Sequence, residues 1–166
     1  MKAASANGNK RPRAILFDWD NTLVDTWPVI HQTLNVTLEE FGLVPWTLAE
    51  SRQRVRRSMR DSFPLLFGDR WEEAGDFFYR CFADIHLDRL RPLPGAEEML
   101  AVLKHHEIYL GIVSNKHGKY LRREVTHLGW DSYFGATVGA HDAPRDKPAT
   151  DAVDLALAGS PVPSGQ

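Results

Sequence analysis

Three short apolar runs, each followed directly by polar residues, predict the strands of a parallel sheet. They cover residues 13–17, 108–113 and 136–140. Between them lie segments in which apolar residues recur three or four positions apart, the spacing of one face of a helix. Strands that alternate with helices favour an α/β protein whose functional residues gather at the carboxyl ends of parallel strands.

Four helices are expected from this spacing. The first begins near Thr26, has Pro28 in its first turn and ends at Gly42. The others are expected over residues 95–104, 117–128 and 148–158, the last with Pro148 in its first turn. Each has an apolar stripe that would pack against a neighbouring element.

The stretch of residues 27–92 contains no strand-like run and is rich in aromatic residues. We predict an inserted helical module there, which leaves residues 13–26 and 93–166 as a discontinuous α/β core. Two prolines and a glycine in residues 91–95 indicate a hinge at the exit of the insert. The polar residues 1–12 predict a flexible N-terminal tail.

Composition and charge narrow the class of protein. The 166 residues are 43% apolar and 25% charged, as in globular proteins, and 20 basic against 22 acidic residues give a net charge of −2. No overall positive field would draw the chain to nucleic acid or to a membrane, so we expect neither as a partner. We find no apolar run of membrane-spanning length and no secretory signal, and we expect a cytoplasmic protein.

Two carboxylates, Asp18 and Asp20, come directly after the first predicted strand. One residue separates them, so in an extended segment both side chains point the same way. Two carboxylates that converge on a cleft suit a site where one binds a cation or attacks and the other transfers a proton. A polar turn at the start of a helix is the alternative interpretation.

Together with two later motifs, this segment resembles the haloacid dehalogenase-like hydrolase superfamily. Residues 17–25 (FDWDNTLVD) resemble its first motif, with Asn21 where glycine is commoner; residues 113–116 (VSNK) resemble the second and residues 146–148 (DKP) the third. The resemblance implies a Rossmann-like parallel sheet core with a type 1 helical cap inserted after the first motif, as in phosphoglycolate phosphatase-like members.

The resemblance also implies a role for each matching residue. Asp18 would be the nucleophile that forms an aspartyl phosphate, and Asp20 the general acid and base. Ser114 and Asn115 would contact the phosphoryl group, and Lys147 would neutralise its charge and that of Asp18. The Asp18 carboxylate and the Asp20 carbonyl would hold Mg²⁺, which prefers hard oxygen ligands. The implied function is a magnesium-dependent phosphomonoesterase that acts on a small phosphorylated metabolite.

The resemblance is incomplete after the third motif. The family carries a fourth motif, an acidic pair after a further strand, and the residues after Lys147 contain neither. We therefore expect the C-terminal strands of the core to be missing and the sequence to be a fragment of a longer phosphatase. Such a fragment should bind magnesium weakly and turn over poorly, or be inactive. The first strand would then be an exposed edge, which predicts self-association through it. The alternatives are a sugar-phosphate mutase of the same superfamily and a non-catalytic remnant or interaction module.

The sequence does not decide the function of two groups of basic residues. Five arginines crowd residues 52–60, where a helix would place Arg52, Arg56 and Arg60 on one face. That face is either a solvated basic surface, a surface that draws an anionic substrate to the cleft, or an RNA contact. Lys116, next to the second motif, is a further candidate for contact with a phosphate.

Overall fold

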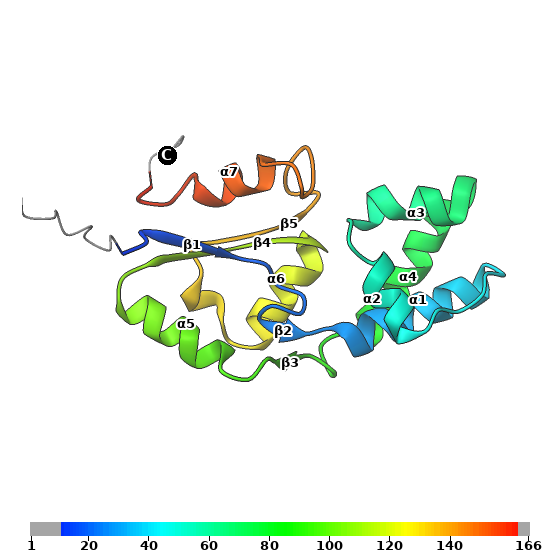
Figure 1. Ribbon diagram of the computed structural model, residues 1–166, viewed down its shortest axis with the longest axis horizontal. Coiled ribbons are helices and arrows are strands. Elements are labelled where there is room, and N and C mark those ends of the chain that lie inside the picture. Colours follow the sequence, from blue (N-terminus) through cyan, green and yellow to red (C-terminus); the bar gives the residue numbers. More distant parts are fainter. Residues whose placement is uncertain (1–10, 163–166) are drawn as a thin grey trace, which may run out of the picture.

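The computed structural model describes residues 11–162 and has a three-stranded parallel sheet (Figure 1). Its strands are β1 (Ala14–Phe17), β4 (Tyr109–His117) and β5 (Ala136–Ala140), in the order β1-β4-β5. Both neighbouring pairs are parallel, which confirms the α/β class. The predicted N-terminal tail lies almost entirely outside the described residues.

Helices cover both faces of this sheet (Figure 1). On one face, α5 (Ala96–His105) and α6 (Gly118–His127) enclose the main core with the short turn η2 (Asp131–Tyr133). On the other face, α7 (Asp151–Leu157) buries Ala152 and Ala156. Successive side chains of β4 alternate between the two cores, as the pleat requires: Leu110 and Ile112 lie in the first and Val113 in the second.

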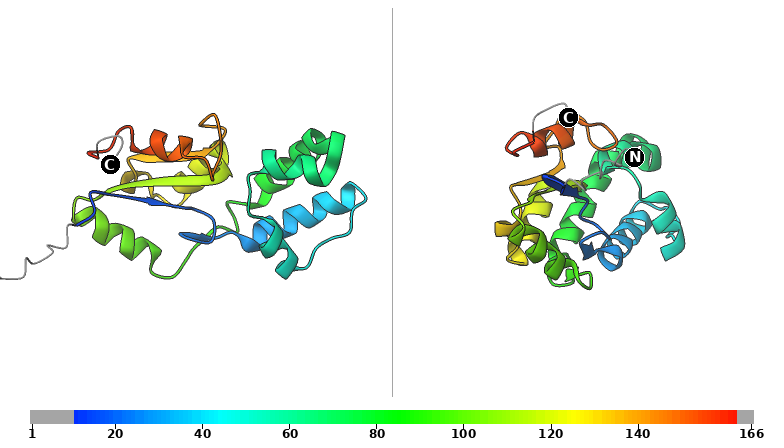
Figure 2. Two further views of the ribbon diagram at one scale, coloured as in Figure 1. Left: turned by 45° about the horizontal axis from the view of Figure 1, so that its top comes forward. Right: turned by 60° about the vertical axis from the view of Figure 1, so that its left-hand side comes forward.

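Of the predicted insert of residues 27–92, the four helices cover residues 27–85, and from here on the term insert means this helical part. They are α1 (Trp27–Glu40), α2 (Leu48–Arg54), α3 (Met59–Phe67) and α4 (Trp71–Ile85), with the turn η1 (Gly68–Arg70) before α4. The helices lie beside the sheet rather than on its faces (Figure 2). They bury a core of their own, built from Val29, Leu34, Leu38, Phe63, Ala74, Phe78 and Phe82, with Tyr120 of α6.

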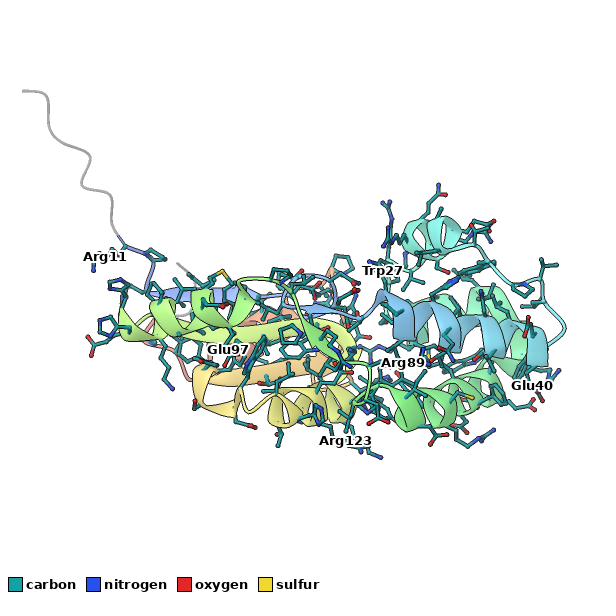
Figure 3. The ribbon with its side chains drawn as sticks, turned by 90° about the horizontal axis from the view of Figure 1, so that it is seen from below. Arg11, Trp27, Glu40, Arg89, Glu97 and Arg123 are labelled. Carbon is teal, nitrogen blue, oxygen red and sulfur yellow. The ribbon has the colours of Figure 1, made fainter. Side chains whose placement is uncertain are left out.

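A two-stranded antiparallel ribbon lies where the chain enters and leaves the insert. β2 (Val24–Asp25) pairs with β3 (Arg91–Pro92), so the two connecting segments run side by side. Figure 3 shows Trp27 and Arg89 near this junction and Glu40 at the far end of the insert. The Arg89 guanidinium donates a hydrogen bond to the side chain of Gln32.

Two of the predicted boundaries are wrong. The middle strand continues to His117, which lies opposite Ala140 of β5, after an irregularity in the register between Val113 and His117. The last helix begins at Asp151 rather than at Pro148. The backbone of Lys147 is held outside a helix by two hydrogen bonds with the side chain of Asn115.

The arginine-rich segment is not one helix. α2 ends at Arg54 and α3 begins at Met59, so Arg56 lies in the connection between them and shares no helical face with Arg60. The expected basic helix face is therefore absent from the described insert.

β1 forms an edge of the sheet, because β4 is its one strand neighbour among residues 11–162. Self-association through this edge stays a prediction. Among the described helices, none combines the length and the apolar character needed to cross a membrane.

Candidate active site

The residues of the three motifs meet at the carboxyl end of the sheet. Asp18 and Asp20 follow β1, Ser114 and Asn115 lie near the end of β4, and Lys147 lies in the loop after β5. Because Phe17 pairs in register with Ile112, the ends of β1 and β4 are adjacent. All five side chains line one cavity of about 1020 Å³ between the sheet and the insert.

The chain turns sharply after Asp20, and Asn21 makes this turn possible. Asn21 has a φ of 59°, in the left-handed region that asparagine adopts more readily than most residues other than glycine. Its side-chain oxygen also accepts a hydrogen bond from the backbone N–H of Thr26, at 3.2 Å. Asparagine therefore serves at the position where the family more often has glycine.

Asp18 and Lys147 form an ion pair that remains open to the cavity. The Lys147 Nζ lies 2.7 Å from the Asp18 Oδ1 and donates a second hydrogen bond, at 2.8 Å, to the carbonyl of Val113. The Asp18 side chain is 44% exposed. Within the described residues its Oδ2 has no hydrogen-bond partner. One oxygen of this carboxylate is thus held and the other faces no protein donor.

Asn115 positions Lys147 through the backbone. Its amide oxygen accepts from the Lys147 N–H at 3.0 Å, and its amide nitrogen donates to the Lys147 carbonyl at 3.1 Å. Its contact with a substrate stays a prediction, since the structure gives this side chain a different task. Ser114 is buried beside it, and its hydroxyl accepts a hydrogen bond from the Lys116 N–H at 3.1 Å.

Asp20 belongs to a second, buried group of charges. The Lys116 Nζ lies 2.6 Å from the Asp20 Oδ1 and 2.6 Å from the Glu124 Oε2. Glu124 also accepts a hydrogen bond from the Trp19 indole at 2.6 Å, and its other oxygen lies 2.9 Å from the His86 Nδ1. We call Trp19, Asp20, His86, Lys116 and Glu124 the buried network.

The ionisation of the buried network follows from these contacts. Burial raises the pKa of Asp20, with the Lys116 ammonium acting in the opposite direction. Burial alone would lower the pKa of Lys116, but the carboxylates of Asp20 and Glu124 outweigh it and raise that pKa. Burial would raise the pKa of Glu124, but Lys116, His86 and Trp19 outweigh it and lower that pKa. Glu124 thus stays ionised, while Asp20 keeps its proton to higher pH than an ordinary carboxyl.

The insert supplies the opposite wall of the cavity. This wall combines aromatic and aliphatic side chains with the guanidinium groups of Arg54, Arg56 and Arg57. Arg60 of α3 instead reaches the loop that carries Lys147, where its Nε lies 2.6 Å from the Asp146 Oδ2. The arginine-rich segment therefore borders the site and also joins the insert to the core.

Sequence reasoning missed Glu124 and His86. Both stand among apolar residues on one helical face, Glu124 beside Leu121 and Val125, and His86 four residues after Phe82. A single polar residue on an otherwise apolar face is the signal that could have marked them. Their partners could not be inferred, because 38 residues separate them.

The sequence profile of one family matches most of the chain. Its description is "Haloacid dehalogenase-like hydrolase", and the match covers residues 15–164. The chain belongs to this haloacid dehalogenase-like hydrolase family. The three motifs in the cavity are the segments on which the resemblance rested, so the family and the site agree.

Known haloacid dehalogenase-like relatives include enzymes named for phosphatase activity. A phosphoglycolate phosphatase of Xylella fastidiosa is 30% identical over 152 residues, which are 89% of this chain and 66% of that protein. A bifunctional riboflavin kinase/FMN phosphatase of Arabidopsis thaliana is 26% identical over 148 residues, or 86% of this chain and 38% of that protein. This chain therefore spans less than two thirds of the length of these relatives.

The fold agrees with solved structures of the same superfamily. The crystal structure of a HAD-superfamily hydrolase from Ehrlichia chaffeensis is 31% identical and superposes with a TM-score of 0.58. The match covers 90% of this chain and 72% of that one.

The donors at the site fit magnesium in kind. The free oxygen of Asp18 and the backbone carbonyl of Asp20 are hard oxygen ligands beside the cavity, and Mg²⁺ is commonly held by one or two carboxylates together with substrate phosphate oxygens. No group of three or more His, Cys, Asp or Glu side chains suited to a metal occurs within residues 11–162. Substrate oxygens or water would supply the remaining ligands.

Proposed function

We propose that the protein hydrolyses phosphomonoesters through an aspartyl phosphate on Asp18. The observation that carries this proposal is the state of the Asp18 carboxylate, which is exposed to the cavity and held at one oxygen by Lys147. A nucleophile that attacks an anionic phosphate needs positive charge beside it, and the Lys147 ammonium supplies such charge. A remnant that had lost its chemistry would not need this cation at the cavity wall.

The first half of the reaction transfers the phosphoryl group to the protein. An Asp18 oxygen forms a bond to phosphorus while the bond from phosphorus to the ester oxygen breaks. The electron pair of that bond stays on the ester oxygen, which takes the proton of Asp20 and leaves as the alcohol. The raised pKa of Asp20 supports its protonated form at this step.

The second half returns the protein to its starting state. Asp20, now a carboxylate, takes a proton from a water molecule as the water oxygen bonds to phosphorus. The bond from phosphorus to Asp18 breaks, Asp18 regains its carboxylate, and inorganic phosphate is released. One acid–base group thus serves both halves of the cycle.

Magnesium is part of this proposal. When bound by the Asp18 carboxylate and the Asp20 carbonyl, Mg²⁺ would offset the negative charge between carboxylate and phosphate. Ser114 would donate its hydroxyl proton to a phosphoryl oxygen. Its buried position at the cavity supports this role.

The leaving group would lie between the sheet and the insert. The cavity has room for a small metabolite, and the insert would act as a cap that excludes water during transfer. Mixed apolar and guanidinium lining supports an organic phosphate ester as substrate. A mutase of the same superfamily would need the product ester rather than water to receive the phosphoryl group.

The test is phosphate release by wild type and by Asp18→Asn, with and without Mg²⁺. We expect the substitution to lower kcat by at least roughly 10³-fold, as for other removed nucleophiles, and a chelator to lower it reversibly. The matched control is Asp151→Asn, which removes a carboxylate of α7 that pairs with Arg145. This variant should keep wild-type activity. Equal activity of Asp18→Asn and wild type would refute the proposal, and isomerisation of a sugar phosphate without phosphate release would favour the mutase.

A further inference from the structure

Lys116 is held between two carboxylates at the wall of the cavity. Its ammonium lies 2.6 Å from an oxygen of Asp20 and 2.6 Å from an oxygen of Glu124. The Lys116 side chain is 6% exposed and that of Glu124 is 1% exposed. A cation this deeply buried and doubly paired is not free to swing out toward a substrate phosphate.

Glu124 is itself fixed on every side. Its Oε2 receives hydrogen bonds from both Lys116 and the Trp19 indole, and its Oε1 lies 2.9 Å from the His86 Nδ1. The His86 ring is stacked on Phe82 at 4.7 Å and is almost fully buried. Rotation of the Glu124 side chain would therefore break several buried contacts at once.

The network joins elements that are distant in the sequence. His86 follows the last helix of the insert, Glu124 lies on α6, Lys116 lies on β4, and Asp20 follows β1. Its free end is Asp20, whose side chain lines the cavity and is 20% exposed. The Asp20 Oδ1 is buried beside the Lys116 ammonium, so the network holds this oxygen while the side chain still faces the cavity.

We propose that Glu124 is a positioning residue of the reaction, which acts through Lys116 to hold the Asp20 carboxyl in place for proton transfer to the leaving oxygen. This inference rests on the proposed role of Asp20. Proton transfer depends steeply on geometry, because donor and acceptor atoms must come within hydrogen-bond distance. Without Glu124, Lys116 is free to seek other acceptors and Asp20 loses its fixed orientation.

The first experiment compares two substrates that differ in their need for a proton. The alcohol of glycerol 3-phosphate must be protonated as it leaves, whereas p-nitrophenyl phosphate releases a stable phenolate. We expect Glu124→Gln to lower kcat for the alkyl ester by roughly 10–100-fold and for the aryl ester by less than about threefold. KM should change little for either. A purely structural role of Glu124 would lower both rates equally.

The matched control is an acidic partner of the same helix. Asp142, just after β5, forms an ion pair with Arg122 of α6 at 2.6 Å, and neither residue belongs to the buried network. Asp142→Asn should leave the ratio of the two rates as in wild type. Equal losses on both substrates in Glu124→Gln would overturn the inference, whereas a wild type that hydrolyses neither substrate would refute the proposed function instead.

A second measurement does not depend on turnover. In ¹⁵N-labelled protein, the buried Lys116 ammonium should give a water-protected NMR signal that is absent from Lys116→Met. We expect Glu124→Gln and Asp20→Asn each to move this signal or speed its exchange with water, while Asp142→Asn leaves it unchanged. A signal that is identical in Glu124→Gln and wild type would show that Glu124 does not hold Lys116 on Asp20.

Discussion

Two lysine–carboxylate pairs stand at the same end of the sheet, and they differ in burial. Lys147 and Asp18 are 30% and 44% exposed, with the cavity directly before them. Lys116 and Asp20 are 6% and 20% exposed, and a second carboxylate closes the pair from behind. An exposed pair can exchange partners at little cost, whereas a buried one cannot. This difference suits a nucleophile whose second oxygen stays open to the cavity and an acid–base group that must stay in place.

Removal of the buried Lys116 ammonium should give the largest effect that tests this difference between the two pairs. Lys116→Met removes the cation that Asp20 and Glu124 share and leaves two carboxyl groups close together with no positive charge between them, so we expect a loss of about 3–5 kcal/mol in the free energy of unfolding. Urea unfolding measures it. Lys119→Met, which removes an exposed lysine of α6, is the control and should change stability by less than about 0.5 kcal/mol. A loss no larger than the control's would contradict the importance of the buried pair.

The exposed pair should show the opposite pattern. Lys147→Met removes positive charge from the phosphoryl site, so we expect kcat to fall by about 10²–10³-fold. The free energy of unfolding should change by less than about 1 kcal/mol, because solvent screens the pair. Phosphate release and urea unfolding on the same preparation test both statements. A variant that loses stability as severely as Lys116→Met would erase the distinction between the pairs.

The pH dependence of stability sharpens the comparison through Glu124. Its pKa is lower in the folded than in the unfolded protein, so its ionised form stabilises the fold. That contribution is complete above the unfolded value of about 4.3 and disappears as the pH falls through the folded value. We expect the free energy of unfolding of wild type to exceed that of Glu124→Gln by about 1–3 kcal/mol at pH 7. The difference should become progressively smaller below about pH 4. A difference that stays constant with pH would mean that another mechanism causes it.

The smallest expected effect concerns the residue that holds Lys147. Asn115→Ala removes two hydrogen bonds to the backbone of Lys147, with an expected cost of about 1–2 kcal/mol and a fall in kcat of roughly tenfold. Asn35 makes the same pair of bonds to Trp46 within the insert, which provides a matched control. Asn35→Ala should cost similar stability and much less kcat. Equal kcat in the two variants would mean that Asn115 does not position the catalytic lysine.

Local patterns predicted the sheet and the exposed part of the site. The apolar run of residues 136–140 coincides with β5, and Asp18 and Lys147 meet as the motif order implied. The strand and the position of Asp18 follow from information close in the chain, namely an apolar run and the polar residues at its end, whereas the role of Lys147 was implied by the resemblance of the three motifs to the family. The distance between the two motifs did not matter, because parallel strands bring their carboxyl ends together.

The buried part could not be predicted in the same way. Lys116 was a candidate for contact with phosphate, yet its ammonium is held by two carboxylates that lie 96 and 8 residues away. The start of α7 was misjudged for a similar reason, since Asn115 fixes the Lys147 backbone from 32 residues away. Pairings between side chains of distant elements produce no periodic pattern in the sequence. A single charged residue on an otherwise apolar helix face can still indicate that such a pairing exists.

The ribbon of β2 and β3 has a consequence for how such a protein can diversify. Asp25 lies opposite Arg91, and Val24 opposite Pro92, so the insert begins and ends at neighbouring points of the framework. A tight turn or an unrelated domain could bridge these points without shifting any strand of the sheet. Replacement of the insert at this ribbon would change which molecules can enter the cavity, while the chemical groups on the sheet would remain the same.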